Sequence, residues 1–121
     1  VVMSSAWNGR VNVAQSKGVP LEIVWDGAAY DWDLWAVPKG TPRRELAMQF
    51  IQFALDAKRQ AYQCGKLIAY GPSNKLAYNY IDKARQKQLP TYPENLAKQF
   101  SFNSKWWQPR LNKLNEKWAA W

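Results

Sequence analysis

Residues 11–25 read VNVAQSKGVPLEIVW, and this stretch decides the predicted fold class. Residues 11–17 are predicted to form a short helix, because a glycine and then a proline follow them and end it. Leu21–Trp25 is a predicted strand, and Val1-Val2-Met3 is another one before the helix. Two strands separated by a helix predict a βαβ unit, and therefore an α/β protein with a parallel sheet.

Further elements are expected along the chain. A third apolar run at Leu34–Val37 ends in Pro38-Lys39-Gly40, which has turn chemistry. Four helices are then predicted, over residues 42–64, 75–80, 93–100 and from 109 onward. The sheet is small for this number of helices, and the chain opens inside an apparent strand. We therefore expect a piece of a longer protein, with incomplete sheets and several helices.

The longest and the last predicted helices carry apolar stripes. Thr41 is placed to cap the longest one, and Pro42 suits its first position. Its stripe has members three or four residues apart: Leu46, Phe50, Phe53, Ala54, Ala57 and Ala61. The stripe of the last helix comprises Leu111, Leu114, Trp118 and Trp121. Both stripes, the two tryptophans included, are predicted to be core.

Composition excludes most enzyme chemistry. The 121 residues contain no histidine, which excludes His-dependent triads and His-ligated metals. One cysteine excludes internal disulfides and Cys-rich zinc sites. That residue, Cys64, ends a predicted helix and is interpreted as a structural or incidental thiol. No glycine pattern fits a phosphate loop, so nucleotide binding has no support and no cofactor is expected.

The charge of +8 is distributed unevenly along the chain. Up to Gly40 there are 3 basic and 4 acidic residues, a balance of −1, which leaves 14 basic and 5 acidic residues, or +9, for the remainder. The four early carboxylates all lie between residues 22 and 33, among tryptophan and tyrosine side chains. Asp33 with the neighbouring Trp32 is the best candidate pair, because carboxylates and aromatic faces together bind ammonium groups.

Three alternatives to a cation site stay open at this point. The carboxylates of Asp31 and Asp33 could simply be solvated or paired with surplus Lys and Arg. They could also act as the acid and base of a glycoside hydrolase, since they lie two residues apart on one face of a strand. The basic remainder could bind nucleic acid or another polyanion. Its Lys and Arg residues are spread over several helices without a recognition motif, which favours a solvated surface.

Seven segments in order resemble the C-terminal part of periplasmic spermidine/putrescine-binding proteins. The segments are Trp7-Asn8-Gly9, Pro20–Trp25, Asp33–Gly40, Glu45–Ile51, Tyr70–Asn74, Tyr92-Pro93-Glu94 and Trp106-Trp107-Gln108. The resemblance spans essentially the whole chain. It implies a two-lobed α/β periplasmic binding protein of type II, the receptor of an ABC importer that delivers its solute to a membrane permease. Such a receptor would lie in the periplasm, or outside the cell on the membrane in a Gram-positive source. The resemblance implies reversible binding rather than enzyme activity, and no nucleic-acid partner.

The resemblance also implies a site for a small cationic solute, a polyamine such as spermidine or putrescine. By match of position, Trp7 would stack on the methylene chain of the solute and Asp33 would pair with an ammonium. Tyr70 and Gln108 correspond to further polar contacts. In the family, an aromatic residue stands two positions before the aspartate that matches Asp33. This chain has Asp31 at that position, and its aromatic residue, Trp32, comes one position later. The candidate site therefore includes both Asp31 and Trp32.

The resemblance further implies how the chain divides. Residues 1–32 would form a βαβ part of the second lobe with the candidate ligand segment, residues 33–40 a hinge strand, and residues 41–121 the helical C-terminal part of the first lobe with return segments. A chain divided in this way contributes to both lobes. We expect it to associate with a missing N-terminal segment or to dimerise.

Overall fold

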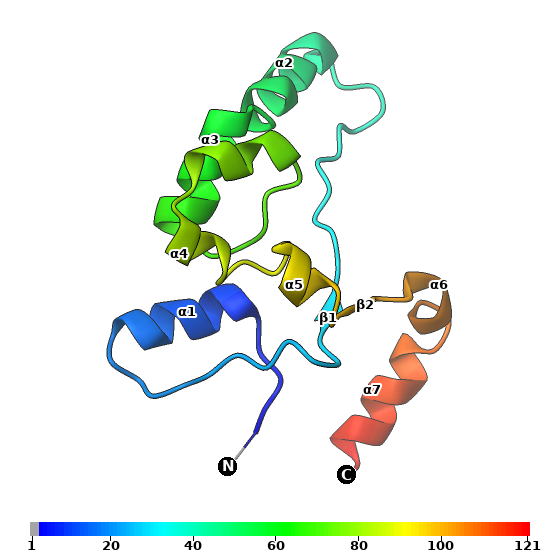
Figure 1. Ribbon diagram of the computed structural model, residues 1–121. Coiled ribbons are helices and arrows are strands. Elements are labelled where there is room, and N and C mark those ends of the chain that lie inside the picture. Colours follow the sequence, from blue (N-terminus) through cyan, green and yellow to red (C-terminus); the bar gives the residue numbers. More distant parts are fainter. Residues whose placement is uncertain (1–2) are drawn as a thin grey trace.

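The computed structural model describes residues 3–121, in which helices predominate (Figure 1). The elements in chain order are α1 (Asn8–Ser16), β1 (Ala29–Tyr30), α2 (Arg44–Ala54), α3 (Ala57–Tyr62), the π-helical turn η1 (Gln63–Leu67), the 3-10 helix η2 (Lys75–Tyr80), α4 (Lys83–Gln86), α5 (Pro93–Leu96), β2 (Phe100–Ser101), α6 (Ser104–Trp107) and α7 (Leu111–Ala119). Within residues 3–121 no helix is long and apolar enough to cross a membrane.

The sheet is parallel, as predicted, but different residues form it. β1 pairs with β2, with Ala29 opposite Phe100 and Tyr30 opposite Ser101. The strand predicted at Leu21–Trp25 is wrong, and the apolar run at Leu34–Val37 forms no strand either, because both segments lack regular structure and no strand within residues 3–121 pairs with them. Of the first predicted strand, Val1 and Val2 lie outside the described residues and Met3 is not in a strand.

The long helix predicted over residues 42–64 is interrupted. At Asp56 the backbone leaves the helical region, with φ −59° and ψ 138°. The Asp56 carboxylate accepts hydrogen bonds from the amides of Lys58 and Arg59, both at 3.1 Å, and so starts α3 as a separate helix. Thr41 does not cap α2, which begins at Arg44 rather than Pro42.

The buried core is formed by α3, η1, η2 and the segments that follow. Its hydrophobic members are Ala61, Cys64, Ala69, Ala77, Ile81 and Leu89. The buried amide of Gln60 adds a polar anchor, because its Oε1 accepts from the Asn74 amide at 2.8 Å and its Nε2 donates to Ser73 at 2.9 Å. These bonds fix the loop at residues 71–74 against α3.

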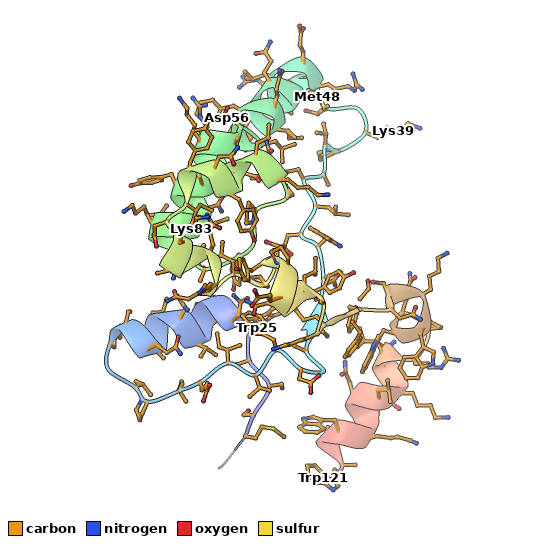
Figure 2. All side chains as sticks on the ribbon, in the orientation of Figure 1. Trp25, Lys39, Met48, Asp56, Lys83 and Trp121 are labelled. Carbon is orange, nitrogen blue, oxygen red and sulfur yellow. The ribbon has the colours of Figure 1, made fainter. Side chains whose placement is uncertain are left out.

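Helices α2 and α7 extend away from this core, so the predicted stripes are largely exposed (Figure 1). Of the α2 stripe, Phe50 is 53% exposed, whereas Ala61 of α3 is buried as predicted. Trp118 is 74% exposed and Trp121 94%, so the prediction that they are core is wrong within this chain. Figure 2 shows Trp121 at the outer end of α7, with no other element beyond it.

Candidate functional site

The first candidate residues lie where α1 begins. Trp7 is the N-cap residue of α1, and its side chain is 68% exposed. Its neighbour Asn8 donates a side-chain hydrogen bond to the carbonyl of Ala69. Gly9 is buried against Tyr70, so closely that a Cβ on Gly9 would lie 2.8 Å from ring atoms of Tyr70. The structure therefore brings Trp7 and Tyr70 to one corner of the molecule, which we call the α1 corner (residues 7–9 with 69–70).

A partly buried pair of hydroxyl groups, on Tyr78 and Thr91, packs against the loop of the α1 corner. Gly71, next to Tyr70, packs tightly against the side chain of Thr91. The Thr91 hydroxyl is 2.8 Å from the phenolic oxygen of Tyr78. Burial raises the pKa of Tyr78, and the hydrogen bond with Thr91 opposes that rise. Tyr78 is thus a neutral, packed side chain that supports the loop carrying Tyr70.

The acidic candidates follow β1 directly. Asp31 and Asp33 are exposed, and one oxygen of the Asp31 carboxylate accepts a hydrogen bond from the Trp32 amide at 2.9 Å. The ring of Trp32 meets that of Tyr30 edge to face, with centroids 6.0 Å apart. Two exposed carboxylates and two aromatic side chains therefore occur within residues 30–33, in the combination that suits an ammonium group.

The strand pairing brings a second aromatic segment to the same end of the sheet. The Phe102 amide donates to the carbonyl of Tyr30 at 2.9 Å. Phe102 stacks on Trp107, with centroids 5.4 Å apart and an interplanar angle of 14°. Gln108 follows Trp107 as the exposed C-cap residue of α6. We call this end of the sheet the strand edge (residues 30–33 with 102–108).

The six predicted residues thus fall into two groups. Trp7 and Tyr70 share the α1 corner, whereas Asp31, Trp32, Asp33 and Gln108 belong to the strand edge. Residues 90–99 connect the two groups: Thr91 packs against Gly71, Gln99 donates to the carbonyl of Pro90 at 2.8 Å, and the Lys98 carbonyl accepts from the Gly27 amide at 3.1 Å.

Three aromatic partners at the strand edge were not predicted as site residues. Trp107 belonged to a segment that carried the resemblance, and Tyr30 lay within the acidic and aromatic stretch, so both had a signal. Phe102 had none, because its role depends on β2 pairing with β1, about 70 residues away in sequence.

Two open grooves lie outside both groups. One has a volume of about 530 Å³ and runs along the start of α2, beside Trp35, Val37 and Leu46. The other, of about 840 Å³, lies at the junction of α2 and α3, beside Phe53, Arg59 and Tyr80. Neither is lined by any of the six predicted residues. Among residues 3–121, no cluster of carboxylate and thiol side chains could hold a metal ion.

Cys64 is placed for packing rather than chemistry. The thiol is buried in the core, and this burial raises its pKa from 9.0 to about 11, although the nearby charge of Arg85 opposes the rise. A thiol with that pKa is protonated at neutral pH and is a poor nucleophile. The interpretation of Cys64 as a structural thiol agrees with its burial.

Comparison with known proteins supplies the family. The model of the family described as bacterial extracellular solute-binding protein matches residues 1–94. The chain belongs to this family. Its most similar relatives include the γ-aminobutyric acid-binding protein of Pseudomonas aeruginosa, which is 41% identical over 121 residues, all of this chain and 34% of the relative.

Solved structures of solute-binding proteins share the fold. The periplasmic binding protein AgtB of A. tumefaciens R10, solved in complex with agropinic acid, is 40% identical with a TM-score of 0.74, over 93% of this chain and 35% of AgtB. An ABC transporter substrate-binding protein of Bradyrhizobium japonicum is 31% identical with a TM-score of 0.75, over 95% of this chain and 36% of that protein. The predicted α/β periplasmic binding protein fold is confirmed, and this chain spans about a third of the length of the relatives.

Proposed function

We propose that this chain carries part of the solute site of an ABC importer's receptor, which captures a small ammonium-bearing solute and delivers it to a membrane permease. Membership of the solute-binding family supports this proposal, as does a relative named as an ABC transporter substrate-binding protein. The receptor acts by reversible binding, without catalysis, and lies in the periplasm or outside the cell.

The observation that carries the proposal is the parallel pairing of β1 with β2. Because parallel strands end at one edge of a sheet, the pairing directs residues 31–33 and 102–108 to the same side. Ligands of open α/β folds bind beyond the carboxyl ends of the strands. The strand edge is such a place, and it holds two carboxylates next to the Trp32 and Tyr30 rings.

The side chains suggest a division of roles within the site. Asp33, whose carboxylate has no hydrogen-bond partner among residues 3–121, would pair with the ammonium, with Asp31 adding negative charge. Trp7 and Tyr70 would stack on the apolar part of the solute, and the Gln108 amide would donate to or accept from its other polar end. In this arrangement residues 1–32 and 41–121 belong to two lobes, and residues 33–40 link them.

We favour an amino-carboxylate such as γ-aminobutyric acid as the solute. The 41% identity to a γ-aminobutyric acid-binding protein supports it, and the Gln108 amide can donate to a carboxylate. A polyamine is the second candidate, because the site contains two carboxylates and its six residues include no basic side chain. Both candidates carry an ammonium group for Asp33. They differ in the group that would lie near Gln108, which is a carboxylate in γ-aminobutyric acid and a further ammonium in a polyamine.

Calorimetry of the full-length protein tests the proposal. We expect heat of binding with γ-aminobutyric acid, or with putrescine or spermidine, and none with butyrate, which lacks the ammonium. Asp33→Asn should weaken binding by about tenfold or more, since it removes a charged hydrogen-bond acceptor. Asp26→Asn is the matched control, because Asp26 is an exposed carboxylate of the same acidic stretch outside the strand edge.

The outcomes separate the solute from the class of site. Binding of butyrate as tight as that of γ-aminobutyric acid would contradict an ammonium site. Absence of binding by every ammonium-bearing compound would contradict the proposed solute class. Binding of γ-aminobutyric acid without binding of putrescine or spermidine, or the reverse, would decide between the two candidates.

A further inference from the structure

Helix α1 is held to the molecule by two polar side-chain contacts and by the close packing of Gly9. Among its nine residues only Gly9 is buried, and Val13 is 44% exposed. Two asparagines, Asn8 and Asn12, lie four residues apart and therefore on one face of the helix. Asn8 donates to the carbonyl of Ala69, and the side-chain oxygen of Asn12 accepts from Arg85. The orientation of α1 thus depends on these two attachments and on the packing of Gly9 against Tyr70.

Arg85 joins α1 to two other elements. Its Nε donates to the carbonyl of Cys64 in η1 at 3.1 Å, and its Nη1 donates to Gln88 at 2.9 Å as well as to Asn12. The side chain is partly buried, and its own element is fixed because the Arg85 amide donates to the Asp82 carboxylate at 2.8 Å. Figure 1 shows α4, which carries Arg85, directly beside α1.

The Arg85 guanidinium donates only to uncharged acceptors within residues 3–121, a backbone carbonyl and two side-chain amide oxygens. Among residues 3–121 the only ion pair joins Arg59 and Asp56, so no carboxylate neutralises the Arg85 guanidinium. Hydrogen bonds from a charged donor are stronger than neutral ones, and the planar guanidinium can serve three acceptors at fixed angles. A lysine could not reproduce this geometry with its single nitrogen.

We propose that Arg85 is a positioning residue for solute binding. Through Asn12 it fixes α1, and α1 in turn holds Trp7, its N-cap residue, at the α1 corner. The inference rests on the proposed function, because it takes Trp7 to contact the solute. It adds a residue that lies outside the site and acts on binding through the position of Trp7.

The test combines substitution with a double-mutant cycle in the full-length protein. Arg85→Met and Arg85→Lys are compared with Arg10→Met, a control that removes the same charge from exposed Arg10 of α1, whose side chain makes no hydrogen bond or ion pair with residues 3–121. We expect Arg85→Met to weaken γ-aminobutyric acid binding by about tenfold, as when a charged hydrogen bond is lost. Arg85→Lys, the variant that keeps the charge, should fold and show a smaller loss, whereas Arg10→Met should bind normally.

Two further readouts separate positioning from general stability. In a Trp7→Ala background the effect of Arg85→Met on affinity should vanish, because both changes then act on the same contact. Hydrogen exchange of residues 8–16 should be faster in Arg85→Met than in Arg10→Met, with or without solute.

Each result has a definite meaning. If the Arg85→Met loss persists in full in the Trp7→Ala background, Arg85 does not act through Trp7 and the inference is overturned. Equal exchange of α1 in Arg85→Met and Arg10→Met overturns it as well. If the unsubstituted protein binds no ammonium-bearing solute, the proposed function fails, and the exchange comparison still decides whether Arg85 fixes α1.

Discussion

Gly9 lies where a side chain would collide with Tyr70. Alanine is usually favoured over glycine inside a helix by up to about 1 kcal/mol. At this position the added Cβ would lie 2.8 Å from Tyr70 ring carbons and 3.0 Å from a side-chain carbon of Ile68. Overpacking of this kind costs about 1–3 kcal/mol, which exceeds the helical gain.

We therefore predict that Gly9→Ala lowers the free energy of unfolding and weakens solute binding, because it pushes α1 or Tyr70 out of place. Urea unfolding and calorimetry of the full-length protein measure the two effects. Gly65→Ala is the matched control, since its added Cβ would make ordinary contacts with Ile81 at 3.7 Å. A Gly9→Ala protein as stable and as tightly binding as the Gly65→Ala protein would contradict the close packing at the α1 corner.

At the scale of elements, the break between α2 and α3 depends on one cap. Replacement of Asp56 by alanine removes the acceptor for the Lys58 and Arg59 amides, and a lost N-cap typically costs about 1 kcal/mol. The ion pair of Asp56 with Arg59 is half exposed at both ends and adds little. We therefore predict that Asp56→Ala destabilises the full-length protein by about 1 kcal/mol in urea unfolding.

The Asp56→Asn variant separates the cap from the charge. An asparagine side chain caps a helix about as well as aspartate but cannot form an ion pair with Arg59, so Asp56→Asn should be close to unchanged in stability. Equal destabilisation by Asp56→Asn and Asp56→Ala would show that the ion pair, rather than the cap, holds this junction.

The elements also show what the sequence could and could not predict. Local signals sufficed for most helices, because helical hydrogen bonds join residues close in sequence. They failed at Asp56, whose capping role competes with an apolar stripe that continues past it. They failed for the strands, because a strand forms only where a partner lies beside it, and the partner of Tyr30 is Ser101. The parallel sheet was expected, but its residues could not be.

The same limits apply to the candidate site. Resemblance to a family pointed to Trp7, Tyr70 and Gln108, and charge with aromatic clustering pointed to Asp31–Asp33. The division into an α1 corner and a strand edge depends on tertiary contacts such as Gly9 with Tyr70. No local pattern encodes such contacts. No sequence pattern distinguished Arg85 from the many other scattered basic residues, so its contacts with α1 could not be predicted.

For the whole molecule, the balance between buried and exposed apolar groups is unusual. Within residues 3–121 the hydrophobic core contains six buried residues, of which Leu89 is the largest fully buried one. Large apolar side chains remain exposed on α2, α6 and α7, and Figure 2 shows Trp121 just beyond the outer end of α7. Exposed apolar surface of this extent is typical of interfaces or of aggregation.

We therefore predict that the 121-residue chain, prepared alone, binds a hydrophobic dye strongly and self-associates as its concentration rises. The apolar end of α7 should contribute, because Trp118 and Trp121 contact each other with centroids 5.4 Å apart and both remain largely exposed. Sedimentation velocity of a Trp118→Ser, Trp121→Ser variant should show weaker association than the unsubstituted chain, at equal helix content by circular dichroism. Lys117→Ser on the same helix is the matched control and should leave association unchanged. A chain that stays monomeric at every concentration and binds no dye would mean that these side chains find cover within the chain itself.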